Sequence, residues 1–116
     1  MKHILFELRG CSSKLLDDPE FIVMALQIGA SRAKSKLLGV NCHHFKPQGV
    51  TAIAMLAESH ISIHTWPEHS LAKCDIFTCS YKTKPLDAVE YMKERFHATE
   101  VVRWACDRST GIDTVL

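Results

Sequence analysis

The chain has 116 residues, 47% of them hydrophobic, with 14 Lys and Arg against 13 Asp and Glu. This length predicts one domain spanning residues 1–116, and the near-neutral, scattered charge excludes the basic surface of a nucleic-acid-binding protein. No stretch reads as a membrane span or a secretory leader, and the five cysteines form neither CxxC pairs nor a disulfide framework. We therefore expect a cytoplasmic protein with a small-molecule partner.

The first half of the chain reads as a strand, a helix and two more strands. Residues 3–8 form the first strand, and Asp18 with Pro19 predicts the start of a helix whose apolar residues recur until Gly39. Residues 40–46 and 50–57 are strand-like and are separated by Pro-Gln-Gly, which predicts a turn.

The second half repeats these element types in another order. Residues 60–66 alternate as a strand, residues 73–80 form a further strand, a second helix begins at Pro85, and residues 99–106 form the last strand. The order βαββββαβ predicts an α+β fold. We expect a two-layer α/β sandwich with an antiparallel-rich sheet and both helices on one face.

The strand at residues 50–57 is apolar on both of its faces. Two helices can cover only one face of a sheet, so the other face needs a second cover. We therefore predict a homodimer in which the sheets of two copies stack.

Polar groups that can move protons follow this strand in the sequence ESHISIHTWPEH, residues 58–69. On a strand, His60, Ser62 and His64 share one face. A metal shared by the two histidines is excluded because a spacing of four residues separates them by about 13 Å. The ordinary alternative is a row of hydrogen-bonded polar residues on a half-buried strand.

The adjacent residues Glu58 and Ser59 offer a less ordinary chemistry. A serine hydroxyl can attack the carbonyl of the preceding residue in an N-to-O acyl shift, given a strained peptide, a base and an oxyanion donor. A nearby histidine could then remove the serine Cα proton.

The segment ESHISIHTWPEH, with FKPQGV before it and CDIFTC after it, resembles the prokaryotic S-adenosylmethionine decarboxylase proenzymes. The likeness extends from about His3 to Cys106. It implies self-cleavage of the Glu58–Ser59 bond into a β chain of residues 1–58 and an α chain of residues 59–116. Ser59 would become a pyruvoyl group that forms a Schiff base with the substrate, with no metal and no pyridoxal phosphate.

The resemblance also implies roles in processing and catalysis. His64 would take the Cα proton, and Thr51, where relatives commonly have serine, would supply a hydroxyl that helps processing. Cys79 would donate the proton that follows loss of CO₂. The ordinary alternative for Cys79 is a small buried apolar residue.

For substrate binding, the resemblance implies that Phe45 and Trp66 flank the adenine of S-adenosylmethionine. Glu68 would accept from the ribose hydroxyls, and Glu7 would be a second acidic group near the substrate. Ordinary core aromatics and solvated charges are the alternatives. The product would be the aminopropyl donor of spermidine and polyamine synthesis.

Besides Thr51, two positions depart from the family pattern. Arg9 stands where an aromatic residue is usual, and Ser12 where an acid is common. A cation near the site would repel a sulfonium and could pair with a carboxylate, so a pyruvoyl-dependent arginine or ornithine decarboxylase is the second enzyme hypothesis. A non-catalytic α+β ligand-binding module is the third hypothesis.

Overall fold

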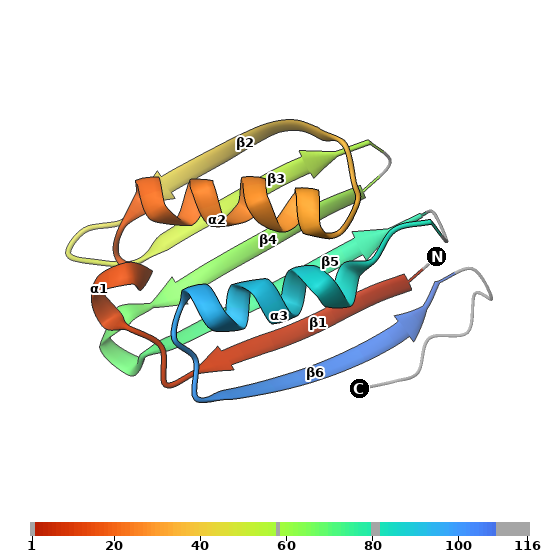
Figure 1. Ribbon diagram of the computed structural model, residues 1–116. Helices are drawn as coiled ribbons and strands as arrows, with labels where there is room; N and C mark the ends of the chain where they lie inside the picture. The colour runs from red at the N-terminus through yellow and green to blue at the C-terminus, as the bar shows by residue number, and fades with distance from the viewer. Residues whose placement is uncertain (1, 58, 80–81, 109–116) are drawn as a thin grey trace.

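The computed structural model describes residues 2–57, 59–79 and 82–108 (Figure 1). Strands and helices follow one another along the chain as β1 (Lys2–Arg9), α1 (Ser13–Leu16), α2 (Pro19–Arg32), β2 (Leu37–His44), β3 (Val50–Leu56), β4 (Ser59–Trp66), a 3-10 turn (Pro67–His69), β5 (Leu71–Thr78), α3 (Pro85–Arg95) and β6 (Glu100–Asp107).

The strands form a six-stranded sheet in the order β2-β3-β4-β5-β1-β6. All neighbouring strands are antiparallel. Helices α2 and α3 run side by side across one face of this sheet (Figure 1). The predicted two-layer α+β fold with both helices on one face is therefore confirmed.

The core lies between the helices and the sheet, as the alternation of apolar residues requires. Phe6 and Leu8 of β1 point toward the helices and are almost fully buried. Ile22 and Leu26 of α2 are buried against the sheet. The start of α2 is as predicted, because Asp18 Oδ1 accepts a hydrogen bond from Phe21 N at 3.1 Å and Pro19 occupies the first turn.

The end of α2 and the segment before it differ from the prediction. The helix ends at Arg32 rather than near Gly39, and Lys34 adopts a left-handed conformation with φ 58° that stops it. Leu37 belongs instead to β2, opposite Leu56. A short helix, α1, was also not predicted; Ser12 Oγ accepts from Leu15 N at its start.

Helix α3 begins at Pro85, as predicted. Val89, Met92 and Phe96 are completely buried, whereas Leu86 in the first turn is 47% exposed. Among the described helices, none is both long and apolar enough to cross a membrane.

The sheet face opposite α2 and α3, here called the open face, is not covered by the described part of the chain. In β3, Val50, Ala52 and the other helix-facing residues are buried, but Ile53 and Met55 on the open face are 46% and 58% exposed. A single copy therefore leaves one apolar face of this strand in water.

Candidate active site

Strand β4 separates apolar from polar side chains, as its sequence predicts. Ile61 and Ile63 are fully buried beneath the helices. The alternating residues His60, Ser62 and His64 therefore belong to the open face. The two histidines lie about 13 Å apart along the strand and are too distant to share one metal ion.

His64 and Thr51 form a side-chain pair across two central strands. They are opposite each other in the β3–β4 register. Thr51 Oγ1 and His64 Nδ1 are hydrogen-bonded at 3.0 Å. The two residues predicted to act in processing are thus in direct contact.

A cavity of about 360 Å³, here called the aromatic recess, opens beside this pair. Phe45 and Trp66 line it and are 46% and 38% exposed, so the interpretation of these rings as ordinary core is wrong. Its lining consists of Phe45, Gln48, Gly49, Thr51, His64, Thr65, Trp66 and Glu68. The fold therefore brings Phe45, Trp66 and Glu68 together with the Thr51–His64 pair.

Ser59 and Cys79 lie at the opposite end of the sheet from this recess. Ser59 begins β4 opposite Leu56, the last residue of β3, and its Oγ donates to Ala57 O at 3.4 Å. Cys79 follows the last residue of β5, and its side chain is exposed, so it is not a small buried core residue. Glu58, on the other side of the predicted cleavage bond, lies outside the described residues.

Two other cysteines, Cys74 in β5 and Cys11 after β1, behave as packing residues. Cys74 is buried, and burial raises the pKa of its thiol well above the ordinary value. Cys11 is also buried, which raises the pKa of its thiol to about 11. Neither thiol has the exposure or the acidity of a reactive cysteine.

One chain does not bring Ser59 and His64 together. Both residues belong to β4, five positions apart, which corresponds to about 16 Å along a strand. Ser59 and Cys79 therefore form one group, here called the cleavage end, at one end of the sheet. Thr51, His64 and the aromatic recess form a second group at the opposite end.

Glu7 lies in the same cross-strand row as His64, with Lys73 of β5 between them. Its carboxylate accepts two hydrogen bonds from Arg9, at 3.0 and 3.2 Å, and Arg9 also bonds Glu100 at 3.0 Å. The hydrogen bonds that Arg9 donates to Glu7 and, second in effect, to Glu100 raise the pKa of Arg9 above its ordinary value. The charge of Arg9 is thus countered by two carboxylates.

A cluster around Asp75 was not predicted. Asp75 accepts hydrogen bonds from His3 Nε2 and His60 Nε2, each at 2.7 Å, and a further one from Ser62 Oγ. Burial, the largest influence, raises the pKa of Asp75, but the bonds from Ser62, His3 and His60 outweigh it and bring the pKa below its ordinary value. The alternation of side chains along β4 and β5 is compatible with His60, Ser62 and Asp75 on one face of the sheet. It does not predict that these side chains touch.

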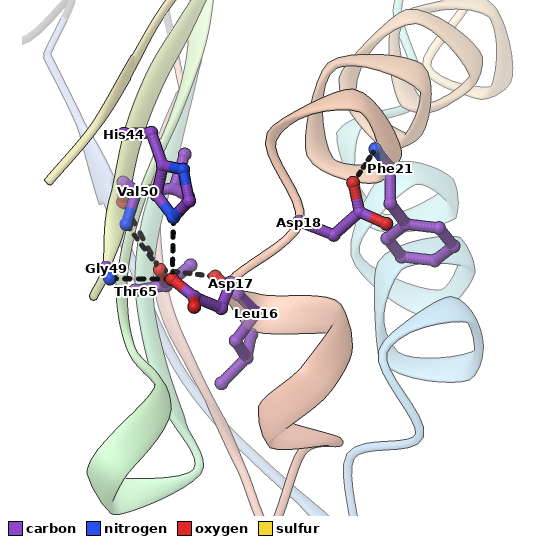
Figure 2. A network of polar contacts seen from close by, with 8 residues as sticks. All are labelled: Leu16, Asp17, Asp18, Phe21, His44, Gly49, Val50 and Thr65. Atoms are coloured by element: carbon purple, nitrogen blue, oxygen red, sulfur yellow. Dashed lines mark hydrogen bonds and ion pairs between the residues drawn. The ribbon is translucent and has the colours of Figure 1, made fainter. Parts of the chain in front are cut away.

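A second unpredicted network, shown in Figure 2, connects the end of α1 and the residue after it to β4 and to both ends of the loop between β2 and β3. Asp17 Oδ1 accepts from Gly49 N at 2.9 Å and from His44 Nε2 at 2.8 Å. Thr65 Oγ1 donates to Leu16 O at 2.7 Å and accepts from Val50 N at 2.8 Å. These bonds fix the loop between β2 and β3, which contributes Phe45 and Gly49 to the recess.

An Asp17→Asn variant is expected to melt at a lower temperature than the wild type at pH 6, with a difference that shrinks in acid. The hydrogen bonds from Gly49 and then His44 lower the pKa of Asp17. Its stabilising effect is therefore present above the ordinary carboxyl pKa of about 3.9 and is lost as the pH falls through the lowered value. Thermal melts of both proteins from pH 6 to pH 2 measure this.

Asp18→Asn is the matched control for this prediction. Asn caps a helix as well as Asp does, so this neighbouring change should have little effect on the melting temperature. A difference between wild type and Asp17→Asn that stays constant down to pH 2 would contradict an ionised Asp17 contact.

Comparisons with known proteins identify the family of the chain. The family model described as S-adenosylmethionine decarboxylase matches residues 2–109. The S-adenosylmethionine decarboxylase proenzyme of Synechococcus sp. (strain WH7803) is 45% identical over 97 residues, covering 84% of this chain and 76% of the relative. That of Clostridium kluyveri is 40% identical over 97 residues, covering 84% and 77%.

A solved structure with a similar fold comes from the same family. The crystal structure of the adenosylmethionine decarboxylase from Aquifex aeolicus matches with a TM-score of 0.85 at 33% identity, covering 92% of this chain and 88% of that one. The matches in sequence and in fold both span most of the chain. The chain belongs to the S-adenosylmethionine decarboxylase family.

Proposed function

We propose that this chain is a self-cleaving, pyruvoyl-dependent decarboxylase of S-adenosylmethionine whose active site is assembled from two copies. The observation that carries the proposal is the Thr51–His64 pair beside a recess with two exposed aromatic rings. The product would be the decarboxylated aminopropyl donor for spermidine and other polyamines.

Ser59 suits the origin of a pyruvoyl group, which supplies a ketone that accepts the electrons released when CO₂ leaves. Ser59 is the first residue of β4, and only two residues separate it from the end of β3. Its hydroxyl lies near the backbone of this tight connection. Attack of Ser59 Oγ on the carbonyl of Glu58 would replace the peptide bond with an ester. Removal of the Ser59 Cα proton would then eliminate the ester oxygen, which releases residues 1–58 with a carboxylate end and leaves dehydroalanine at position 59. The imine tautomer of this group would be hydrolysed by water to the pyruvoyl ketone, with loss of ammonia.

His64 has the partner that a proton acceptor needs. When Nδ1–H donates to Thr51 Oγ1, the lone pair of Nε2 stays available to take a proton. Thr51 would thus select the tautomer of His64, and its hydroxyl would supply what a serine supplies in relatives. Cys79, with an exposed side chain near Ser59, would return a proton to the substrate carbon after CO₂ is lost.

The separation of the two groups supports a site shared between copies. If two open faces stack about a two-fold axis that runs across the strands, the cleavage end of one copy faces the aromatic recess of the other. Stacking would also cover Ile53, Met55 and Trp104, which are 46%, 58% and 40% exposed in one copy. The homodimer predicted from β3 and the incomplete site of a single copy therefore have one explanation.

The recess has the chemistry for a positively charged nucleoside. Phe45 and Trp66 offer flat rings for a purine and attractive faces for a sulfonium, and Glu68 offers acceptors for sugar hydroxyls. Arg9 does not oppose a cationic substrate, because Glu7 and Glu100 pair with it. The reason to prefer arginine or ornithine as substrate is thereby weakened.

Purified protein is expected to release labelled CO₂ from carboxyl-labelled S-adenosylmethionine and at most traces from arginine or ornithine. The three substrates are compared in parallel at equal concentrations, with unlabelled S-adenosylmethionine as competitor. Release from arginine or ornithine alone would contradict the proposed substrate, and release from none of the three by a cleaved protein would contradict decarboxylase activity.

A further inference from the structure

Asp75 connects three neighbouring strands on the open face. It lies on β5, between β1 and β4. Its Oδ2 atom accepts from His3 of β1 and from His60 of β4, and its Oδ1 atom accepts from Ser62 of β4. One carboxylate therefore links both adjacent strands to β5, the strand that Cys79 follows.

The contacts are those of a hydrogen-bonded cluster. The two imidazole nitrogens and a carboxylate oxygen lie within 4.8 Å of one another, which would also suit three metal ligands. However, each Nε2 is 2.7 Å from Oδ2, whereas the ligand atoms of a tetrahedral zinc lie about 3.3 Å apart. An ionised carboxylate only accepts, so both imidazoles carry a proton on Nε2.

His60 is the first complete residue after the proposed cut. In the intact chain, the backbone continues on both sides of His60. After cleavage, only the terminal group at position 59, still joined to His60 by an amide, precedes it. New chain ends are ordered only where specific contacts hold them. The His60 side chain is 36% exposed, and its ring also lies near Phe77 and His3, with centroids 6.1 Å away in both cases.

We propose that the Asp75 cluster, which consists of His3, His60, Ser62 and Asp75, is a clamp that fixes the new end of the cut chain. It holds the ring of His60, and through it the terminal group at position 59, in the position that the reaction requires. The inference rests on the proposed cleavage before Ser59. Asp75 and His3 act as positioning residues, since they act on the reacting group through His60.

The first test separates turnover from binding. Asp75→Asn protein is expected to cleave itself to completion, because the clamp is needed only after the cut. Its kcat for S-adenosylmethionine should then fall about 10- to 100-fold, the range expected when a reacting group is slightly misplaced. Its KM should stay within about twofold, because no residue of the clamp lines the aromatic recess. Glu94→Gln, an exposed change on α3, is the control.

The second test measures the clamp without activity. Hydrogen exchange of the peptide covering residues 60–64 is expected to be faster in cleaved Asp75→Asn protein than in cleaved wild type. In a Ser59→Ala background, where the chain stays intact, Asp75→Asn should change this exchange little. His3→Gln, which removes one of the three hydrogen bonds, should give a smaller change in the same direction.

Three results would overturn the clamp. They are equal acceleration of exchange in the cleaved and uncleaved backgrounds, an exchange rate in cleaved protein that Asp75→Asn leaves unchanged, and zinc that co-purifies at one ion per chain and is lost in Asp75→Asn. A wild-type chain that never cleaves would contradict the proposed function instead. Cleaved wild type with an exchange rate that Asp75→Asn does not alter would contradict only the clamp.

Discussion

A Ser59→Ala chain is expected to remain a single species near 13.1 kDa. The wild type should instead yield two fragments, one that ends at residue 58 and one that begins at residue 59. The variant lacks the hydroxyl that would attack the preceding carbonyl, so neither the chain break nor the pyruvoyl group can form. Intact mass spectrometry measures both outcomes, and decarboxylation by the variant should be undetectable.

The wild-type fragment that begins at residue 59 provides a second readout. It should be lighter than a fragment starting with serine by one ammonia, should resist Edman degradation, and should react with hydroxylamine through its ketone. Ser13→Ala, an exposed change on α1, should cleave like the wild type. An intact wild-type chain without a ketone would refute the pyruvoyl enzyme and favour a non-catalytic binding module.

The second large effect concerns the sharing of the site between copies. Ser59→Ala and His64→Ala chains should each stay uncleaved when produced alone, since loss of a proton acceptor slows such steps by about 10²- to 10⁴-fold. When the two are produced together with different tags, the His64→Ala chain should be cleaved. Its own Ser59 and Cys79 would then face the intact Thr51–His64 pair of its partner.

Decarboxylase activity should return in dimers that combine one Ser59→Ala chain with one His64→Ala chain. Each such dimer can contain at most one intact active site. The matched control combines Ser59→Ala with Cys79→Ala. Both changes affect the cleavage end, so no pairing of these two chains contains an intact site, and decarboxylation should not recover. Recovery in the control, or an uncleaved His64→Ala chain in the mixed preparation, would contradict the shared site.

Much of the fold could be predicted because local patterns determine it. Alternation in β4 follows directly from the order of Ile61, Ile63 and the polar residues between them. The start of α2 follows from Asp18 and Pro19. The end of α2 could not be predicted in this way, because Leu37 continues the helical spacing while the left-handed turn at Lys34 ends the helix.

The site was predictable in its residue types but less so in its connections. Alternation specifies which face a residue occupies, but the register between strands depends on the whole fold. His3 and Asp75 are 72 residues apart in sequence, and no local signal joins them. The gap between Ser59 and His64, in contrast, can be counted from the sequence at about 3.3 Å per residue, which already indicates that one strand cannot unite them.

The strand order β2-β3-β4-β5-β1-β6 has a consequence for a chain cut between residues 58 and 59. The first fragment would contain β1, β2 and β3, and the second would contain β4, β5 and β6. Since β1 lies between β5 and β6, the two fragments would be interleaved within one sheet. They could separate only by breaking three strand ladders, β3–β4, β5–β1 and β1–β6. The cut protein would therefore remain one folded body, and once unfolded it could regain its sheet only by a bimolecular encounter of its two pieces.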